Sequence, residues 1–300
     1  LDGVFSAVRQ ADVQLLLLAA PLYLVSLWVL AYRWHLLVRM ADGVSHLPKA
    51  AEAFFTSVVI NYAAPIGLAV PSRAALTKRA LGLDAAQTGT IALWEIAFDL
   101  LVLACGAAIW LLIADGAPSA VRDEIAESST SYLVAGVALV LLALAVVGIA
   151  IRRPGIRAKL ASVGATIMLA PSKRPMAAGY TLFVTLLYWV MQGIVLWLLV
   201  MALGVSVSAP FMLGFTSIPI LIGMLSPIPG GAAVREGLMY VVARLSGYGD
   251  ESDAVLAAAL IYRFALFAAI PILFSLNRLW LNSSGNPDMK SREIPADERI

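Results

Sequence analysis

Long apolar stretches separated by short polar segments dominate the pattern of hydrophobic and polar positions along this chain. Val13 to Tyr32 and Tyr132 to Ile151 are each about 20 residues without a charge. A helix of about 20 apolar residues is long enough to cross the hydrocarbon layer of a bilayer, which is about 30 Å thick. Further spans are predicted over 85–114, 176–203 and 253–276. The pattern therefore predicts an all-α polytopic membrane protein.

Composition supports a membrane environment. The 300 residues are 61% hydrophobic and only 13% charged, against roughly 25% charged in soluble domains. No cleavable signal peptide is expected, because the first stretch is longer than a signal h-region and no small-residue cleavage pattern follows it. Cys105 is the single cysteine, so no internal disulfide can form.

The distribution of basic residues predicts the orientation. Lysine and arginine are enriched in cytoplasmic loops. Basic residues gather in three places, after the first span, between the second and third apolar stretches, and after the connecting span: Arg33, Arg39 and Lys49; Arg73, Lys78 and Arg79; Arg152, Arg153, Arg157, Lys159, Lys173 and Arg174. The loops after Ala114 and near Asp250 are acidic. We expect a multi-pass protein of the bacterial inner (plasma) membrane with its N-terminus outside and its C-terminus cytoplasmic.

Two proline- and glycine-containing stretches do not fit single crossings. Residues 50–70 have basic segments on both sides, so we expect a re-entrant hairpin that enters from the cytoplasm and turns near "NYAAPIG" (61–67). Residues 210–246 connect two outside turns, so a second hairpin turns at "SPIPGG" (226–231). Its arms of about 16 or 17 residues favour a half-depth hairpin, and a fully spanning helical pair is the alternative.

Together these elements predict an inverted-topology repeat with two re-entrant helical hairpins, a recurrent plan in transporters. Pro65 precedes Arg73 by eight positions, and Pro227 precedes Arg235 by the same spacing. We predict a single transmembrane domain over 1–281, with repeat one at about 13–114, a connecting span at 132–151 and repeat two at about 176–278. A disordered cytoplasmic tail is expected over 282–300.

The two turns are candidate anion sites. A helix that begins after each turn presents amides without internal partners and the positive end of its dipole, which suits a phosphate group. Gly230 and Gly231 would let the backbone approach a headgroup, and Arg235 would bind phosphate oxygens through its planar fork. In the alternative interpretation, Arg235 and Glu236 form a solvated pair at the cytoplasmic interface. Arg73 has the same interfacial alternative.

Three ionisable residues are predicted within spans. Glu95 and Asp99 are four apart on one helical face, and Arg263 lies in the last span. We expect all three to face the bundle interior, with Arg263 paired to a carboxylate or lining a hydrated cavity. Glu95 and Asp99 could couple transport to protons; alternatively, a buried ion pair locks the two repeats together. Asn61 is a candidate binding residue that could instead cap its turn.

Five segments of the chain resemble a known protein family. "RWHLLVRM", "NYAAPIGLAVPSRAALTKRALGL", "EIAFD", "PIPGGAAVREG" and "ALIYRF" occur in this order from Arg33 to Pro271. They are similar to the transmembrane domain of lysylphosphatidylglycerol synthases, a flippase-type module that also occurs as a stand-alone protein. The resemblance implies that the chain moves lipids across the bilayer. It also implies functional roles for the matching positions, which are Arg73, Glu95, Asp99, Pro229, Gly230, Gly231, Arg235, Glu236 and Arg263.

The function we expect is a non-catalytic lipid translocator, a flippase or scramblase for a phosphate-bearing or aminoacylated phospholipid or a polyprenyl-linked lipid. The alternative is an intramembrane enzyme acting on a polyprenyl phosphate or pyrophosphate, which would need a carboxylate cluster such as Glu95 with Asp99. No metal or cofactor is expected, since His35 and His46 lack partners at ligand spacing. The expected partners are a membrane lipid substrate, a second copy of the chain and a separate lipid-modifying enzyme, but not nucleic acid.

Overall fold

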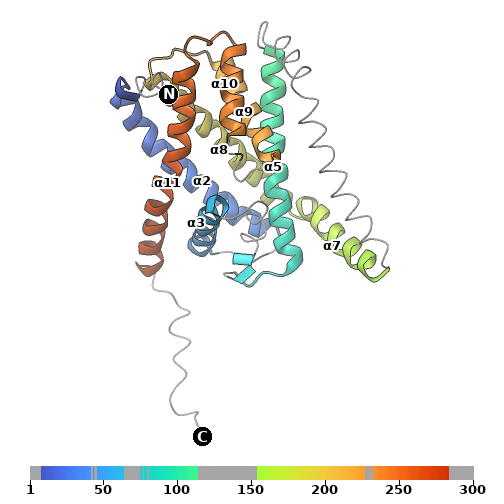
Figure 1. Ribbon diagram of the computed structural model, residues 1–300. Helices are drawn as coiled ribbons and strands as arrows, with labels where there is room; N and C mark the ends of the chain where they lie inside the picture. Colours follow the sequence, from blue (N-terminus) through green and yellow to red (C-terminus); the bar gives the residue numbers. More distant parts are fainter. Residues whose placement is uncertain are drawn as a thin grey trace.

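The computed structural model describes residues 8–41, 43, 46–63, 75–76, 78–79, 81–113, 154–226, 231 and 233–283. This part of the chain is helical, without strands. Its helices, labelled as in Figure 1, are α2 (Val13–Met40), α3 (Leu47–Ala63), α5 (Ala85–Ile113), α7 (Pro154–Lys173), α8 (Pro175–Ala202), α9 (Ala209–Leu225), α10 (Val234–Leu245) and α11 (Ser252–Ser283).

Local sequence signals explain several helix ends. Asp12 caps α2 by accepting a 2.8 Å hydrogen bond from the amide of Gln14. Asp84 and Gln87 form a reciprocal capping box at the start of α5, at 2.7 and 3.0 Å. α8 ends at Ala202, and Gly204, with a φ of 84°, allows a Schellman motif in which the Val205 amide donates to the Val200 carbonyl over 3.3 Å.

Within the described ranges, four helices are long and apolar enough to cross a membrane: Val13–Met40, Ala86–Ile113, Pro175–Ala202 and Ser252–Trp280. Large apolar side chains cover their outer faces, with Leu112 85%, Met176 74% and Phe264 64% exposed. Soluble proteins rarely expose apolar surface on this scale. The chain is therefore a membrane protein whose outer surface suits lipid.

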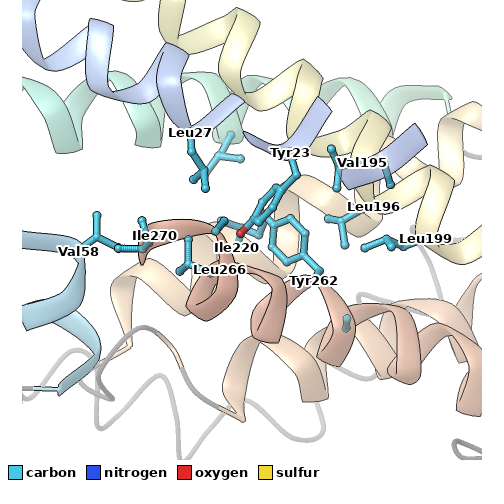
Figure 2. Close-up of a cluster of buried hydrophobic side chains, with 14 of the residues drawn as sticks. Tyr23, Leu27, Val58, Val195, Leu196, Leu199, Ile220, Tyr262, Leu266 and Ile270 are labelled. Atoms are coloured by element: carbon cyan, nitrogen blue, oxygen red, sulfur yellow. The ribbon is translucent and has the colours of Figure 1, made fainter. Parts of the chain in front are cut away.

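A continuous apolar core joins these helices (Figure 2). α2 and α8 pack along one another, and the Asp12 amide donates a 2.7 Å hydrogen bond to the Ala202 carbonyl where the start of α2 meets the end of α8. α9 packs on α5 through small residues. A Cβ built on Gly214 would lie 2.5 Å from Trp110, so only glycine lets this buried indole lie flat on α9.

α3 lies at the opposite end of the bundle from α10 (Figure 1). Its contacts with α11 come from near the end of that helix. The Asn277 amide donates to the Pro48 carbonyl over 3.0 Å, and Arg278 pairs with Glu52 at 3.0 Å. Trp28 of α2 packs against Trp280 with ring centroids 5.7 Å apart.

The structure differs from the sequence predictions at three element boundaries. The first span was predicted to end at Tyr32, but α2 continues to Met40, so Arg33 and Arg39 are helical rather than part of a loop. The basic segment after Ile151 was treated as a loop, and most of it forms α7. α11 also includes Asn282 and Ser283, which were assigned to the tail. α2 and α11 extend past their apolar segments because residues 33–40 and 277–283 contain no proline or glycine that would end a helix.

The predicted connecting span at 132–151 and the tip of the first hairpin lie outside the described residues. The arms of the second predicted hairpin are α9, with 17 residues, and α10, with 12.

Candidate functional site

The turn between α9 and α10 depends on a close approach of two glycines. Gly231 has a φ of 63°, which favours glycine, and a Cβ on it would lie 2.8 Å from the Gly223 carbonyl oxygen. Gly223 in turn faces Arg235, with 3.2 Å between its ideal Cβ position and the Cβ of Arg235. The start of α10 is therefore held against α9. Gly230, the neighbouring predicted site residue, lies outside the described residues.

The first turn of α10 carries the charged residues that the sequence singled out. Ala233 precedes the helix with a φ of 64°, an uncommon conformation for a residue with a Cβ, and makes no side-chain cap. Arg235 and Glu236 follow it, and a carboxylate in the first turn is favoured by the helix dipole.

Arg235, Glu236 and Arg263 form what we call the α10–α11 cluster. Arg263 of α11 donates to Glu236 Oε1 over 2.6 Å, and Arg235 donates to the same oxygen over 3.4 Å. The side chains are only 13%, 6% and 12% exposed for Arg235, Glu236 and Arg263. The Arg235 guanidinium also lies over the Tyr262 ring, 5.3 Å from its centroid. Two guanidinium groups therefore meet at one buried carboxylate.

The α10–α11 cluster lies far from both ends of α11 and beside the start of α10. Arg263 is eleven residues beyond Ser252, roughly 16 Å along a helix that rises about 1.5 Å per residue. Arg235 is ten residues before Leu245, or about 15 Å. Each distance is about half of a hydrocarbon layer of about 30 Å. The prediction that Arg263 pairs with a carboxylate is met by Glu236, whereas a solvated Arg235–Glu236 pair does not fit this burial.

Arg33, Glu95 and Asp99 form a second buried group, the α2–α5 cluster. Arg33 is bidentate on Asp99, with one contact at 3.1 Å, and donates to Glu95 over 3.2 Å. The Trp189 indole of α8 also donates to Asp99 over 2.8 Å. All three charged residues are at most 7% exposed. One buried guanidinium therefore meets two carboxylates.

The ion pairs differ in whether they join the two predicted repeats. The pairs of Arg33 with its carboxylates and of Glu236 with Arg263 each lie within one half, 13–114 or 176–278, whereas the pair of Arg278 with Glu52 joins the two halves. Sequence reasoning missed Arg33 because it was counted as a loop residue. The signal was present, since two carboxylates within a span require a nearby cation.

The remaining candidates are placed only in part. Asn61 lies in the last turn of α3, and its side chain is not among the described ones. Arg73 lies outside the described residues. Within the part of the chain that is described, no group of three His, Cys, Asp or Glu side chains could hold a metal ion.

Comparisons with known proteins agree with the sequence resemblance. Residues 1–274 match the family model described as the lysylphosphatidylglycerol synthase TM region. The chain is 35% identical over 88 residues to the inner membrane protein YbhN of Escherichia coli (strain K12), a match covering 29% of this chain and 26% of that protein. The matched segment is thus about a quarter of the relative's length. Because the family model covers most of the helical bundle and both ion clusters, this chain belongs to the lysylphosphatidylglycerol synthase transmembrane-region family.

Proposed function

We propose that this protein is a non-catalytic lipid translocator that moves a phosphate-bearing lipid across the bilayer. The observation that carries the proposal is the pair of buried arginines, Arg235 and Arg263, that meet at Glu236 about 15 Å along α10 and α11 from Leu245 and Ser252. Guanidinium groups within a span are unfavourable in lipid, and such residues mark the pathway of a charged substrate. The phosphate of a lipid headgroup is an anion that reaches this depth only during translocation.

The chemistry of the cluster suits phosphate. Arginine presents several donors in one plane and binds phosphate oxygens in pairs. The first amides of α10 point out of the start of the helix, the end that carries Arg235 and Glu236. The N-cap residue Ala233 provides no side-chain cap for these amides. In our proposal the headgroup binds here while its acyl chains remain in the surrounding lipid. Aminoacylated phospholipids and polyprenyl-linked lipids meet the same requirement.

We further propose that α9 and α10 form a half-depth hairpin entering from outside, and that α3 begins a matching hairpin from the cytoplasm. The contacts with α11 support this arrangement. α10 joins α11 through Glu236 and Arg263, on the side where α11 begins, whereas α3 contacts Asn277 and Arg278 near its end. Rocking of one half against the other would then expose the cluster to each side in turn.

We propose no catalytic step. Glu95 and Asp99 are the two carboxylates within spans that a phosphatase-like reaction would use, and Arg33 engages both. The hydrogen bonds from Arg33 and from the Trp189 indole occupy carboxylate oxygens that would have to face a water molecule in such a reaction. Proton coupling through Glu95 and Asp99 remains part of the proposal.

Leaflet exchange in proteoliposomes tests the proposed function. Purified protein is reconstituted with tail-labelled fluorescent phosphatidylglycerol, and the outer leaflet is quenched chemically over time. We expect faster quenching of the inner-leaflet pool with the wild type, and a loss of this gain in Arg263→Ala. Arg278→Ala is the matched control, since it removes an arginine of the same helix whose side chain is 55% exposed.

Two results would overturn the proposal. One is unchanged leaflet exchange in a folded Arg263→Ala protein. The other is release of inorganic phosphate from a polyprenyl pyrophosphate in the same vesicles, which would favour the enzyme alternative.

A further inference from the structure

The two oxygens of Glu236 have different surroundings. Oε1 accepts hydrogen bonds from both Arg235 and Arg263, at 3.4 and 2.6 Å. Oε2 is buried and accepts no hydrogen bond within the part of the chain that the structure describes. Glu236 as a whole is 5% exposed. The α10–α11 cluster thus has a buried acceptor without a donor beside two guanidinium groups.

A buried acceptor without a donor is unfavourable, because the protein has removed its water without replacing the hydrogen bond. The free-energy cost of burying an oxygen without a hydrogen bond is larger for an ionised carboxylate than for a neutral group. The groups facing Glu236 do not solve this problem: Arg235 and Arg263 both donate to Oε1, and the Tyr262 ring lies under the Arg235 guanidinium. A ligand that donated a hydrogen bond to Oε2 would therefore stabilise the arrangement of Arg235, Glu236 and Arg263 that the structure shows.

These two features together define a kind of occupant. An anionic phosphate complements the guanidinium groups of Arg235 and Arg263, and an N–H or O–H group close to that phosphate complements Oε2. Ethanolamine headgroups carry such a donor as an ammonium, and glycerol headgroups carry it as a hydroxyl. A choline headgroup has the same charge as ethanolamine but has no N–H.

We propose that Glu236 is a specificity-determining residue, and that its Oε2 selects lipids whose headgroup carries an N–H or O–H donor beside the phosphate. This inference rests on the proposed function, since it assigns the headgroup to the same cluster. Sites built to hydrogen-bond a ligand group reject the analogue that lacks it, because the site's own polar atom then stays unsatisfied. Headgroups without a donor are moved slowly for this reason, although their phosphate fits the arginines.

The test is a series of tail-labelled lipids in proteoliposomes of the wild-type protein. Phosphatidylethanolamine and its mono-, di- and trimethylated forms keep the charge constant while the N–H donors fall from three to none. Phosphatidylglycerol and phosphatidylmethanol form a second arm, in which the anionic charge is constant and only the hydroxyl donors are lost. We expect leaflet exchange to fall at least about tenfold when the last donor is removed, the effect of one hydrogen bond to a charged group. A fall confined to one arm identifies the ammonium or the hydroxyl as the recognised donor.

A variant locates the selectivity. Glu236→Asp keeps the charge that balances the two arginines but withdraws the carboxylate by one methylene group, so we expect exchange to continue with reduced discrimination. Glu52→Asp makes the same change in an exposed pair with α11 and should leave discrimination as in the wild type. Should Glu236→Asp not fold, the wild-type series still decides.

Equal exchange of all members of both series by the wild type would overturn the inference and leave the proposed function standing. Equal exchange is also expected if a water molecule donates to Oε2, because the headgroup then needs no donor of its own. Absence of exchange for every lipid, with a folded protein, would instead overturn the proposed function. Discrimination that persists unchanged in a folded Glu236→Asp protein would remove Glu236 as its source.

Discussion

Arg263 of α11 donates a 2.6 Å hydrogen bond to Glu236 in the first turn of α10, and this contact joins a long membrane helix to the short helix after the glycine turn. Arg235 shares the same carboxylate oxygen. Since one carboxylate serves two guanidinium groups, the three residues are not equivalent, and their removal should have unequal consequences.

Glu236→Ala should destabilise the protein more than Arg263→Ala. The first change leaves two buried like charges, whereas the second leaves a neutral Arg235–Glu236 pair. Removing one partner of a buried pair costs about 3–5 kcal/mol when a charge is left uncompensated. We expect a loss of that size for Glu236→Ala and a clearly smaller one for Arg263→Ala, measured as the free energy of unfolding in detergent. Arg278→Ala should change it by no more than about 1 kcal/mol.

An equal loss for Glu236→Ala and Arg263→Ala would contradict the charge count. It would indicate that packing, rather than the balance of ions, sets the contribution of this cluster to stability.

Gly231→Ala should weaken the α9–α10 packing. A methyl group at this position would lie 2.8 Å from the Gly223 carbonyl oxygen and would hold a φ of 63°. Overpacking and the left-handed conformation together should cost about 2 kcal/mol or more. Gly237→Ala is the matched control in α10, because nothing lies within 4 Å of its Cβ position.

Gly237→Ala should raise stability by about 0.5–1 kcal/mol, since alanine is the better helix former. Thermal unfolding of both variants and the wild type checks that Gly231→Ala lowers the stability and that Gly237→Ala raises it. Equal stability of Gly231→Ala and Gly237→Ala would mean that the turn adapts without loss.

The length of the apolar stretches predicted the long helices well, because these helices are apolar on almost every face. The spans predicted at 85–114 and 176–203 differ by one residue at an end from α5 and α8. Helix ends in polar sequence were predicted less well. The end of α2 was placed at the first charge, but Arg33 is buried and paired, so a charge there does not mark the membrane surface.

The chemistry of the site was predicted in part. The sequence indicated that Glu95, Asp99 and Arg263 would face the bundle interior, because isolated ions are unfavourable in a span. Their partners were not predictable, since these depend on which helices are neighbours. Gly231 was predicted to let the backbone approach a headgroup, and its close approach to Gly223 of α9 is a separate reason for glycine that the sequence did not reveal.

Arg33→Ala should destabilise the protein strongly, whereas Asp99→Asn should be tolerated. Loss of Arg33 leaves Glu95 and Asp99 buried as like charges, which should cost about 3–5 kcal/mol. Asparagine at 99 leaves one guanidinium with one carboxylate, and its carbonyl oxygen can still accept the Trp189 indole N–H. Arg39→Ala, at an exposed position of the same helix, is the control. Unfolding in detergent compares the three variants.

A larger loss for Asp99→Asn than for Arg33→Ala would contradict this order. It would show that the hydrogen bonds accepted by Asp99, rather than the charge balance, hold α2, α5 and α8 together.

The predicted orientation can be tested at the two ends of the repeat-two helices. Cys105 is exposed and is first replaced by alanine, so that single cysteines report alone. In intact spheroplasts, a membrane-impermeant maleimide should label Gly249→Cys, in the exposed turn between α10 and α11, because basic residues stay inside and this acidic turn lies outside. Lys173→Cys, exposed at the end of α7, should be labelled only after permeabilisation. The reverse pattern would invert the topology and place the entrance of the α9–α10 segment on the cytoplasmic side. Labelling of both positions in intact cells would contradict a crossing by α8, which lies between them in the sequence.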